Sequence, residues 1–180
     1  KNGVLLFNGI PYAEPPVGDR RFKRPVSPVS WDDIRDATRF GPAAPQLPSG
    51  GMTDSVPVNW NEDCLFLNVW SADGSNKNGN QDNGGLPVMF WIHGGGNSIG
   101  ESSTSIYNGA HLSREHNLVL VSINYRLGPL GWFRHAALQN ETNTPADDSG
   151  NYGTLDIILA LQWVRDNIAA FGGDPDNITI

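Results

Sequence analysis

The stretch WIHGGGNSIG, residues 91–100, holds the residues of this chain whose types and spacing point most directly to chemistry. Gly96-Asn97-Ser98-Ile99-Gly100 matches G-x-S-x-G, the pattern of a nucleophile elbow whose serine attacks an acyl carbon. His93 and the three glycines after it match a second pattern, in which backbone N–H groups stabilise a developing oxyanion. The two patterns overlap, so only the surrounding residues can separate them.

Ser98 fits the elbow pattern poorly. An elbow requires a sharp turn directly after a strand and directly before a helix. His93-Gly94-Gly95 separates Ser98 from the preceding apolar run, and residues 101–105 (ESSTS) open a helix only weakly. Gly100-Glu101-Ser102 matches the first three positions of the same pattern, but Thr104 stands where the pattern requires glycine. We therefore predict that neither serine is a nucleophile.

The HGGG segment, residues 93–96, suits an oxyanion loop better. Glycines allow unusual dihedral angles and let the backbone approach a substrate closely. The alternative is a tight glycine turn with no chemistry. The four residues alone do not distinguish the two.

The elements that must position this stretch alternate between strands and helices. Apolar runs predict strands at 64–70, 88–92 and 118–123, and the start of another at 177–180. Helices are predicted at 108–116 and at 153–170, where apolar residues form a broad stripe and glycines and a proline follow. This alternation predicts an α/β fold with a largely parallel sheet.

Two other regions carry less regular signals. Proline and glycine dominate the first fifty residues, which predicts irregular loops and short edge segments. Residues 71–85 are polar and low in complexity, which predicts a flexible surface loop between strands. Neither region indicates a second domain.

Composition limits the class of partner. The chain has 180 residues, a net charge of -7 and 38% hydrophobic residues, as in an ordinary globular domain. The negative charge argues against nucleic acid and anionic membrane surfaces. No apolar run is long enough to predict a membrane span. The first residues do not resemble a signal peptide, but a chain that begins with Lys1 leaves the compartment undecided.

Several ordered stretches resemble one family. They are FNGIPYAEPPVGDRRF, FGPAAPQ, EDCLFLNVW, LPVMFWIHGGG, SINYRLGPLGW, GNYGTLDIILALQWVRDNIAAFGGDP and NITI. Together they resemble the N-terminal part of a type-B carboxylesterase, the group of α/β-hydrolases that includes the cholinesterases. The resemblance runs nearly end to end and implies a partial α/β-hydrolase fold, the N-terminal part of its mostly parallel sheet with flanking helices.

The resemblance also implies site residues. Gly95 and Gly96 would supply two oxyanion-hole N–H groups. The family's G-E-S-A-G elbow follows the strand that begins at Asn177, so the nucleophile is expected a few residues past Ile180. The acid and the histidine are expected later in the chain. Residues 1–180 would then be an incomplete α/β-hydrolase domain, truncated just before the elbow and inactive alone.

The implied function is hydrolysis of a small carboxylic ester through an acyl-enzyme. The alternative is a catalytically dead relative used for adhesion or binding. We expect no cofactor and no metal. His93 is expected to brace the loop, His111 and His116 are five residues apart, and His135 lies in a polar segment.

The resemblance further implies two buried ion pairs, Arg21 with Glu62 and Arg126 with Asp156. Ala44 stands where many secreted members have a cysteine, so Cys64 is expected to be a free, buried structural thiol. A lone cysteine suits a bacterial-type cytoplasmic, periplasmic or secreted enzyme. Asn97 replaces a common aromatic residue of the acyl pocket. Sequons begin at two further asparagines, Asn140 and Asn177.

Overall fold

A five-stranded sheet forms the centre of the molecule. The computed structural model describes residues 3–48, 59–72, 85–140 and 143–180. Within them the strand order is β1-β2-β4-β3-β5. The strands are β1 Val4–Pro11, β2 Phe66–Ala72, β3 Leu86–Ile92, β4 Val119–Ile123 and β5 Gly173–Thr179. The helices are α1 Ala110–His116, α2 Gly128–Gly131 and α3 Tyr152–Asn167, with 3-10 turns at Gly18–Arg20, Ser105–Tyr107, Ala136–Leu138 and Ile168–Phe171.

The sheet is mixed. β3 pairs in parallel with both β4 and β5, as the alternation of strands and helices predicts. β1 pairs with β2, and β2 with β4, in antiparallel fashion. The strands predicted at 64–70, 88–92 and 118–123 are therefore confirmed as β2, β3 and β4. The expectation of a largely parallel sheet holds for the three strands that helical crossovers connect.

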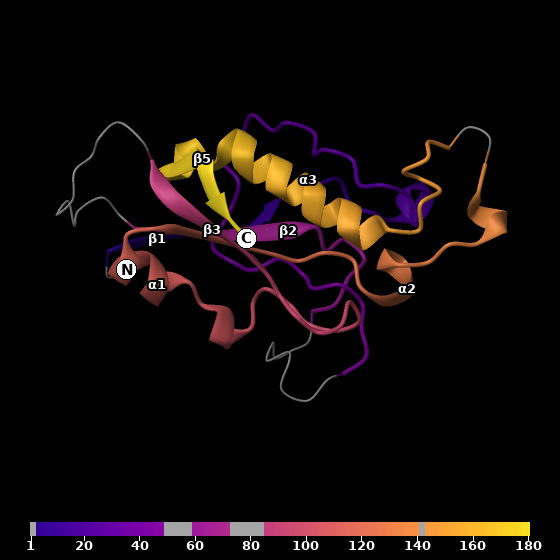
Figure 1. Cartoon of the computed structure of the whole chain (residues 1–180), viewed down its shortest axis with the longest axis horizontal. Coiled ribbons are helices and arrows are strands. Elements are labelled where there is room, and N and C mark those ends of the chain that lie inside the picture. Colours follow the sequence, from indigo (N-terminus) through magenta and orange to yellow (C-terminus); the bar gives the residue numbers. More distant parts are fainter. Residues whose placement is uncertain (1–2, 49–58, 73–84, 141–142) are drawn as a thin grey trace.

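Two apolar layers hold the helices to the sheet. α3 lies on one face and α1 on the other (Figure 1). Ala160 and Val164 of α3 are fully buried in the larger layer, together with β-branched residues of β3 and β4. Trp70 and Leu120 form the smaller layer beneath α1. Burial on both faces explains why β4 reads as a continuous apolar run rather than an alternating one.

The N-terminal region is more regular than predicted. Short edge segments were expected there, and β1 is a longer one, an eight-residue strand at the edge of the sheet. Its pairing with β2 shifts register between Phe7 and Ile10, and Gly9 there has a φ of 66°. The Gly9 N–H leaves the ladder and donates to Asn68 Oδ1 at 3.0 Å. A glycine bulge thus interrupts the strand pattern without ending the strand.

The C-terminal strand also starts earlier than predicted, at Gly173 rather than Asn177. Gly173 pairs with Leu86, but the next pair joins Ile178 to Val88, so the residues between them bulge out of the ladder. Pro175 is tolerated there because β5 is an edge strand among the described residues. Of the glycines and the proline that were predicted to end the helix, Gly172 does so: it ends the 3-10 turn with a φ of 85°.

Two predicted features lie partly outside the described residues. β2 continues to Ala72, into the predicted surface loop, and residues 73–84 of that loop are outside. Residues 141–142 of the first sequon are outside as well. Among the helices that the structure describes, none combines the length and the apolar character that crossing a membrane requires.

Candidate functional site

Residues 93–100, the glycine loop, follow β3 at its carboxyl end. Gly95 has a φ of 119°, and a Cβ placed there would overlap the carbonyl oxygen of Ile99. Gly96 has a φ of 61° and open space where a Cβ would lie. Position 95 therefore accepts glycine alone, whereas position 96 imposes backbone strain without a clash.

The first part of this loop, Gly94–Gly96, is the front half. The backbone N–H groups of Gly95 and Gly96 have no acceptor within the part of the chain that the structure describes. Gly96 is exposed and Gly95 is half-buried. Backbone donors are normally paired with protein or solvent, so these two are available to a ligand.

The last part, Ser98–Gly100, is the rear half, and each of its N–H groups has an acceptor. Ser98 and Ile99 both donate to the carbonyl of Gly95, at 3.1 and 3.2 Å. Gly100 donates to Oε1 of Gln46 at 2.7 Å. The rear half is thus a closed turn attached to the N-terminal segment.

Because the peptide bond is planar, contacts to a carbonyl also set the direction of the N–H group in the same peptide, here those of Gly95 and Gly96. In a trans peptide, each N–H points opposite to the carbonyl of the preceding residue. The Gly96 N–H is therefore directed by the Gly95 carbonyl, which the rear half holds. The Gly95 N–H is directed by the Gly94 carbonyl, which lies 2.9 Å from Nδ1 of His93.

His93 is buried beneath the loop. Its ring stacks on Tyr125 with centroids 4.5 Å apart, and a Cβ on Gly100 would come within 2.5 Å of Nδ1. A carbonyl only accepts hydrogen bonds, so Nδ1 carries the proton that bonds Gly94. Burial lowers the pKa of His93, against smaller opposing effects of the Gly94 bond and Glu101. The structure agrees with a bracing role for this side chain.

Two further hydrogen bonds hold the loop to the segment after β4. Burial raises the pKa of Tyr125 to about 12, so its hydroxyl stays protonated and donates to the His93 carbonyl at 2.7 Å. The Gly128 N–H donates to the carbonyl of Asn97, also at 2.7 Å. Both contacts join residues that are about thirty positions apart, and local sequence patterns did not indicate them.

A buried polar network holds the segment that follows the loop. The amide of Asn68 donates to the hydroxyls of Ser102 and Ser122, at 3.0 and 3.1 Å. Asn124 accepts from the Ser102 N–H at 2.8 Å and donates to the carbonyl of Pro42 at 2.9 Å. Paired polar groups in a low-dielectric interior fix their positions strongly. Ser102 is therefore part of the scaffold and is not exposed to a substrate.

Ser98 lies in the turn and not between a strand and a helix. It is exposed, and its hydroxyl donates to the carbonyl of Gly96 at 3.2 Å. The ring nitrogen Nδ1 of His93 is already bound to Gly94. Among the described residues, no base contacts the Ser98 hydroxyl, as activation of a serine nucleophile would require.

Comparison with known proteins agrees with this architecture. The model of the carboxylesterase family matches residues 1–180, the whole chain. This chain belongs to the carboxylesterase family. It is 46% identical over 182 residues to a para-nitrobenzyl esterase of Bacillus subtilis, covering 100% of this chain and 34% of that protein. It is 44% identical over 180 residues to a fumonisin B1 esterase of Sphingopyxis macrogoltabida, covering 98% and 31%.

Solved structures of the family show the same fold. A carboxylesterase of Geobacillus stearothermophilus superposes with a TM-score of 0.82 at 43% identity, covering 100% of this chain and 34% of that one. The fold is therefore part of an α/β-hydrolase fold. The chain spans about a third of the length of the relatives that it matches.

Both ion pairs expected of a carboxylesterase chain are present, but they differ in burial. Nε and Nη2 of Arg126 donate to the two oxygens of Asp156 at 2.8 and 2.7 Å, with side chains 3% and 0% exposed. Arg21 makes the same two-pronged contact with Glu62 at 2.6 and 2.8 Å, with side chains 44% and 27% exposed. The expectation of burial was wrong for this second pair, because Arg21 follows an exposed turn.

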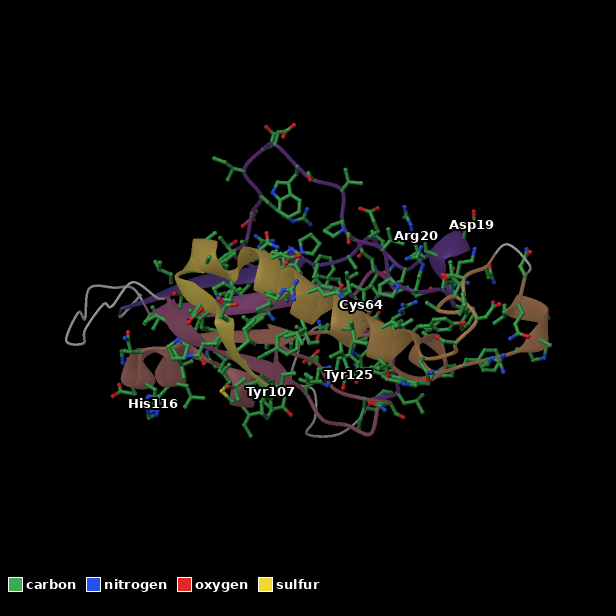
Figure 2. The ribbon with its side chains drawn as sticks, turned by 45° about the horizontal axis from the view of Figure 1, so that its top comes forward. Asp19, Arg20, Cys64, Tyr107, His116 and Tyr125 are labelled. Atoms are coloured by element: carbon green, nitrogen blue, oxygen red, sulfur yellow. The ribbon has the colours of Figure 1, made fainter. Side chains whose placement is uncertain are left out.

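Cys64 is fully buried and free, as expected. Figure 2 shows it in the interior of the molecule. Burial, and then the nearby Asp156 carboxylate, raise the pKa of its thiol well above the usual value. A thiol that stays protonated is a poor nucleophile, so Cys64 is a packing residue.

The remaining histidines lie apart from one another in the described part of the chain. His111 and His116 lie exposed on α1, and His116 is at the periphery in Figure 2. His135 accepts a hydrogen bond from the Ala137 N–H at 3.1 Å. The described ranges contain no group of three His, Cys, Asp or Glu residues placed to hold a metal ion.

A cleft of about 720 Å³ lies elsewhere, between α3 and residues 27–37. Trp31, Ile34, Trp163 and Phe171 are among its lining residues, and no residue of the glycine loop lines it. We place the candidate site at the glycine loop and not at this cleft. The reason is that the loop presents free hydrogen-bond donors, which the chemistry of acyl transfer requires.

Proposed function

We propose that this chain is the N-terminal part of a serine carboxylic-ester hydrolase, in which Gly95 and Gly96 supply two N–H groups of the oxyanion hole. The observation that carries the proposal is that neither N–H group has an acceptor among the described residues, while neighbouring contacts fix their directions. Membership of the carboxylesterase family and the names of its relatives support it.

The proposed reaction has two steps. A serine hydroxyl attacks the ester carbonyl while a histidine takes its proton, and the carbonyl oxygen becomes an oxyanion. The N–H groups of Gly95 and Gly96 donate to this oxyanion, which then collapses and expels the alcohol as the histidine returns the proton. Water hydrolyses the resulting acyl-enzyme by the same route.

The residues assigned to this chain act only on the oxyanion. The serine, the acid and the histidine are proposed to come from residues past Ile180, in that order. Because the oxyanion forms during the reaction, the two N–H groups lower the barrier more than they strengthen substrate binding. Each such donor lowers the barrier by about 3 kcal/mol.

Reading the coding sequence downstream of Ile180 tests the proposal first. A G-x-S-x-G segment within a few codons, with an acid and a histidine later, is the expected result. The complete protein should then hydrolyse p-nitrophenyl butyrate and react with a fluorophosphonate probe. Another residue at the serine position, with neither hydrolysis nor labelling, would refute the proposal and favour an adhesion or binding role.

A further inference from the structure

We propose that Gln46 is a positioning residue that, by holding the backbone of Gly100, sets the direction of the Gly96 N–H, one of the two proposed oxyanion-hole donors. This inference rests on the proposed function. It arises from one juxtaposition: the side-chain amide of Gln46, in the N-terminal segment, meets both the N–H and the carbonyl of a glycine 54 positions later.

The contact is two-sided. The Gly100 N–H donates to Oε1 of Gln46 at 2.7 Å, and Nε2 of Gln46 donates to the Gly100 carbonyl at 2.9 Å. Nε2 also donates to the carbonyl of Ala44 at 3.1 Å. Because Oε1 faces a donor and Nε2 faces two acceptors, only one orientation of the amide satisfies all three contacts.

Gly100 needs an outside support of this kind. Its φ is 117°, a conformation that L side chains rarely adopt, and the ring of His93 occupies the space where a Cβ would lie. The residue therefore has no side chain that could fix it. An unusual backbone conformation persists only where its surroundings impose it.

Fixing Gly100 also fixes the Gly95 carbonyl and, with it, the Gly96 N–H in the front half of the loop. Gly100 follows Ile99, whose N–H holds the carbonyl of Gly95 together with that of Ser98. That carbonyl shares a peptide plane with the Gly96 N–H. The chain of contacts therefore runs from Gln46 through the rear half to a proposed oxyanion donor.

Replacing Gln46 by glutamate changes only one side of this contact. A carboxylate keeps the acceptor for the Gly100 N–H but places an anionic oxygen against the carbonyls of Gly100 and Ala44. Q46M keeps the length of the side chain and removes all three hydrogen bonds. Gln162, exposed on α3, provides the matched control, because Q162E makes the same chemical change far along the chain from the loop.

The first measurement is steady-state kinetics of the complete protein, with active sites counted by titration with diethyl p-nitrophenyl phosphate. In Q46E and Q46M we expect kcat per active site to fall by about 10- to 100-fold while KM changes less than about threefold. Affinity for a trifluoromethyl ketone, which forms a tetrahedral adduct, should fall in proportion to kcat/KM. Q162E should match the wild type.

The second measurement is hydrogen–deuterium exchange, which reports the loop whether or not the protein is an esterase. The amides of Ser98 and Ile99 should exchange faster in both Q46E and Q46M, that of Gly100 should exchange faster in Q46M, and those of β4 should not. Unchanged loop exchange, or a lower melting temperature with unchanged kcat per active site, would overturn the role of Gln46. Faster loop exchange in a protein without esterase activity would support the contact and refute the proposed function.

Discussion

The two halves of the glycine loop lie next to each other in the chain but differ in how their backbone groups are used. In the front half, the N–H groups of Gly95 and Gly96 donate to nothing among the described residues. In the rear half, every N–H donates, and Gln46 binds Gly100 from two sides. The difference teaches that donors kept free for a ligand need neighbours whose own backbone groups are paired, because a mobile donor stabilises an oxyanion poorly.

Gly95→Ala should have the largest effect, because it disturbs both halves together. The added methyl would overlap the Ile99 carbonyl, and the φ of 119° is unfavourable for alanine. We expect kcat/KM of the complete protein to fall by about 10³-fold, with a clearly lower melting temperature. Gly18→Ala is the control, since Gly18 has a φ of 57°, open space around its Cβ position and no part in the loop. Activity within tenfold of wild type in Gly95→Ala would contradict the assignment.

Gly96→Ala tests the front half alone. The φ of 61° costs an alanine about 1 kcal/mol, but nothing lies within 4 Å of the new methyl and the N–H remains. We expect a loss of kcat of less than about tenfold and a small loss of stability. The useful comparison is the ratio of the kcat of this variant to that of Gly95→Ala, measured in the same assay. Equal losses of kcat in the two variants would show that the clash with the Ile99 carbonyl is not the cause of the Gly95→Ala defect.

Acid should weaken the front half through His93. Burial places the pKa of this residue below its ordinary 6.5, so folding favours the neutral ring. The unfolded chain then binds more protons, and the stabilisation present above about pH 6.5 is lost as the pH falls toward the folded-state pKa. Melting temperatures of wild type and His93→Gln, measured from about pH 5 to pH 7.5, should differ most at the upper end. A constant difference over this range would show that His93 does not titrate differently on folding.

The regular part of the fold was accessible from local sequence because its signals are local. Buried runs of apolar residues define β3 and β4, and a helical stripe ending at Gly172 defines α3. β1 and the first residues of β5 were not recognised. In both strands a bulge with glycine or proline interrupts the two-residue period, and the neighbouring strand, not the local pattern, completes the pairing.

The site shows a similar limit. Family resemblance indicated the glycines and the partners of both ion pairs, since these are properties of motifs. It did not indicate that Arg21 and Glu62 are partly exposed, or that Gln46 reaches Gly100. Such features depend on contacts between segments that are distant in sequence. The stretch FGPAAPQ contains Gln46, but its spacing carries no sign of where the side chain points.

Ser98→Ala should have the smallest effect, although Ser98 sits in the most suggestive motif of the chain. The substitution removes a hydroxyl that is exposed and bonded only to the Gly96 carbonyl among the described residues. It leaves the Ser98 N–H, which holds the Gly95 carbonyl, in place. We expect kcat and KM of the complete protein to change by less than about twofold, and fluorophosphonate labelling to persist. Loss of labelling would identify Ser98 as the nucleophile, and the contrast between a donating front half and a supporting rear half would no longer hold.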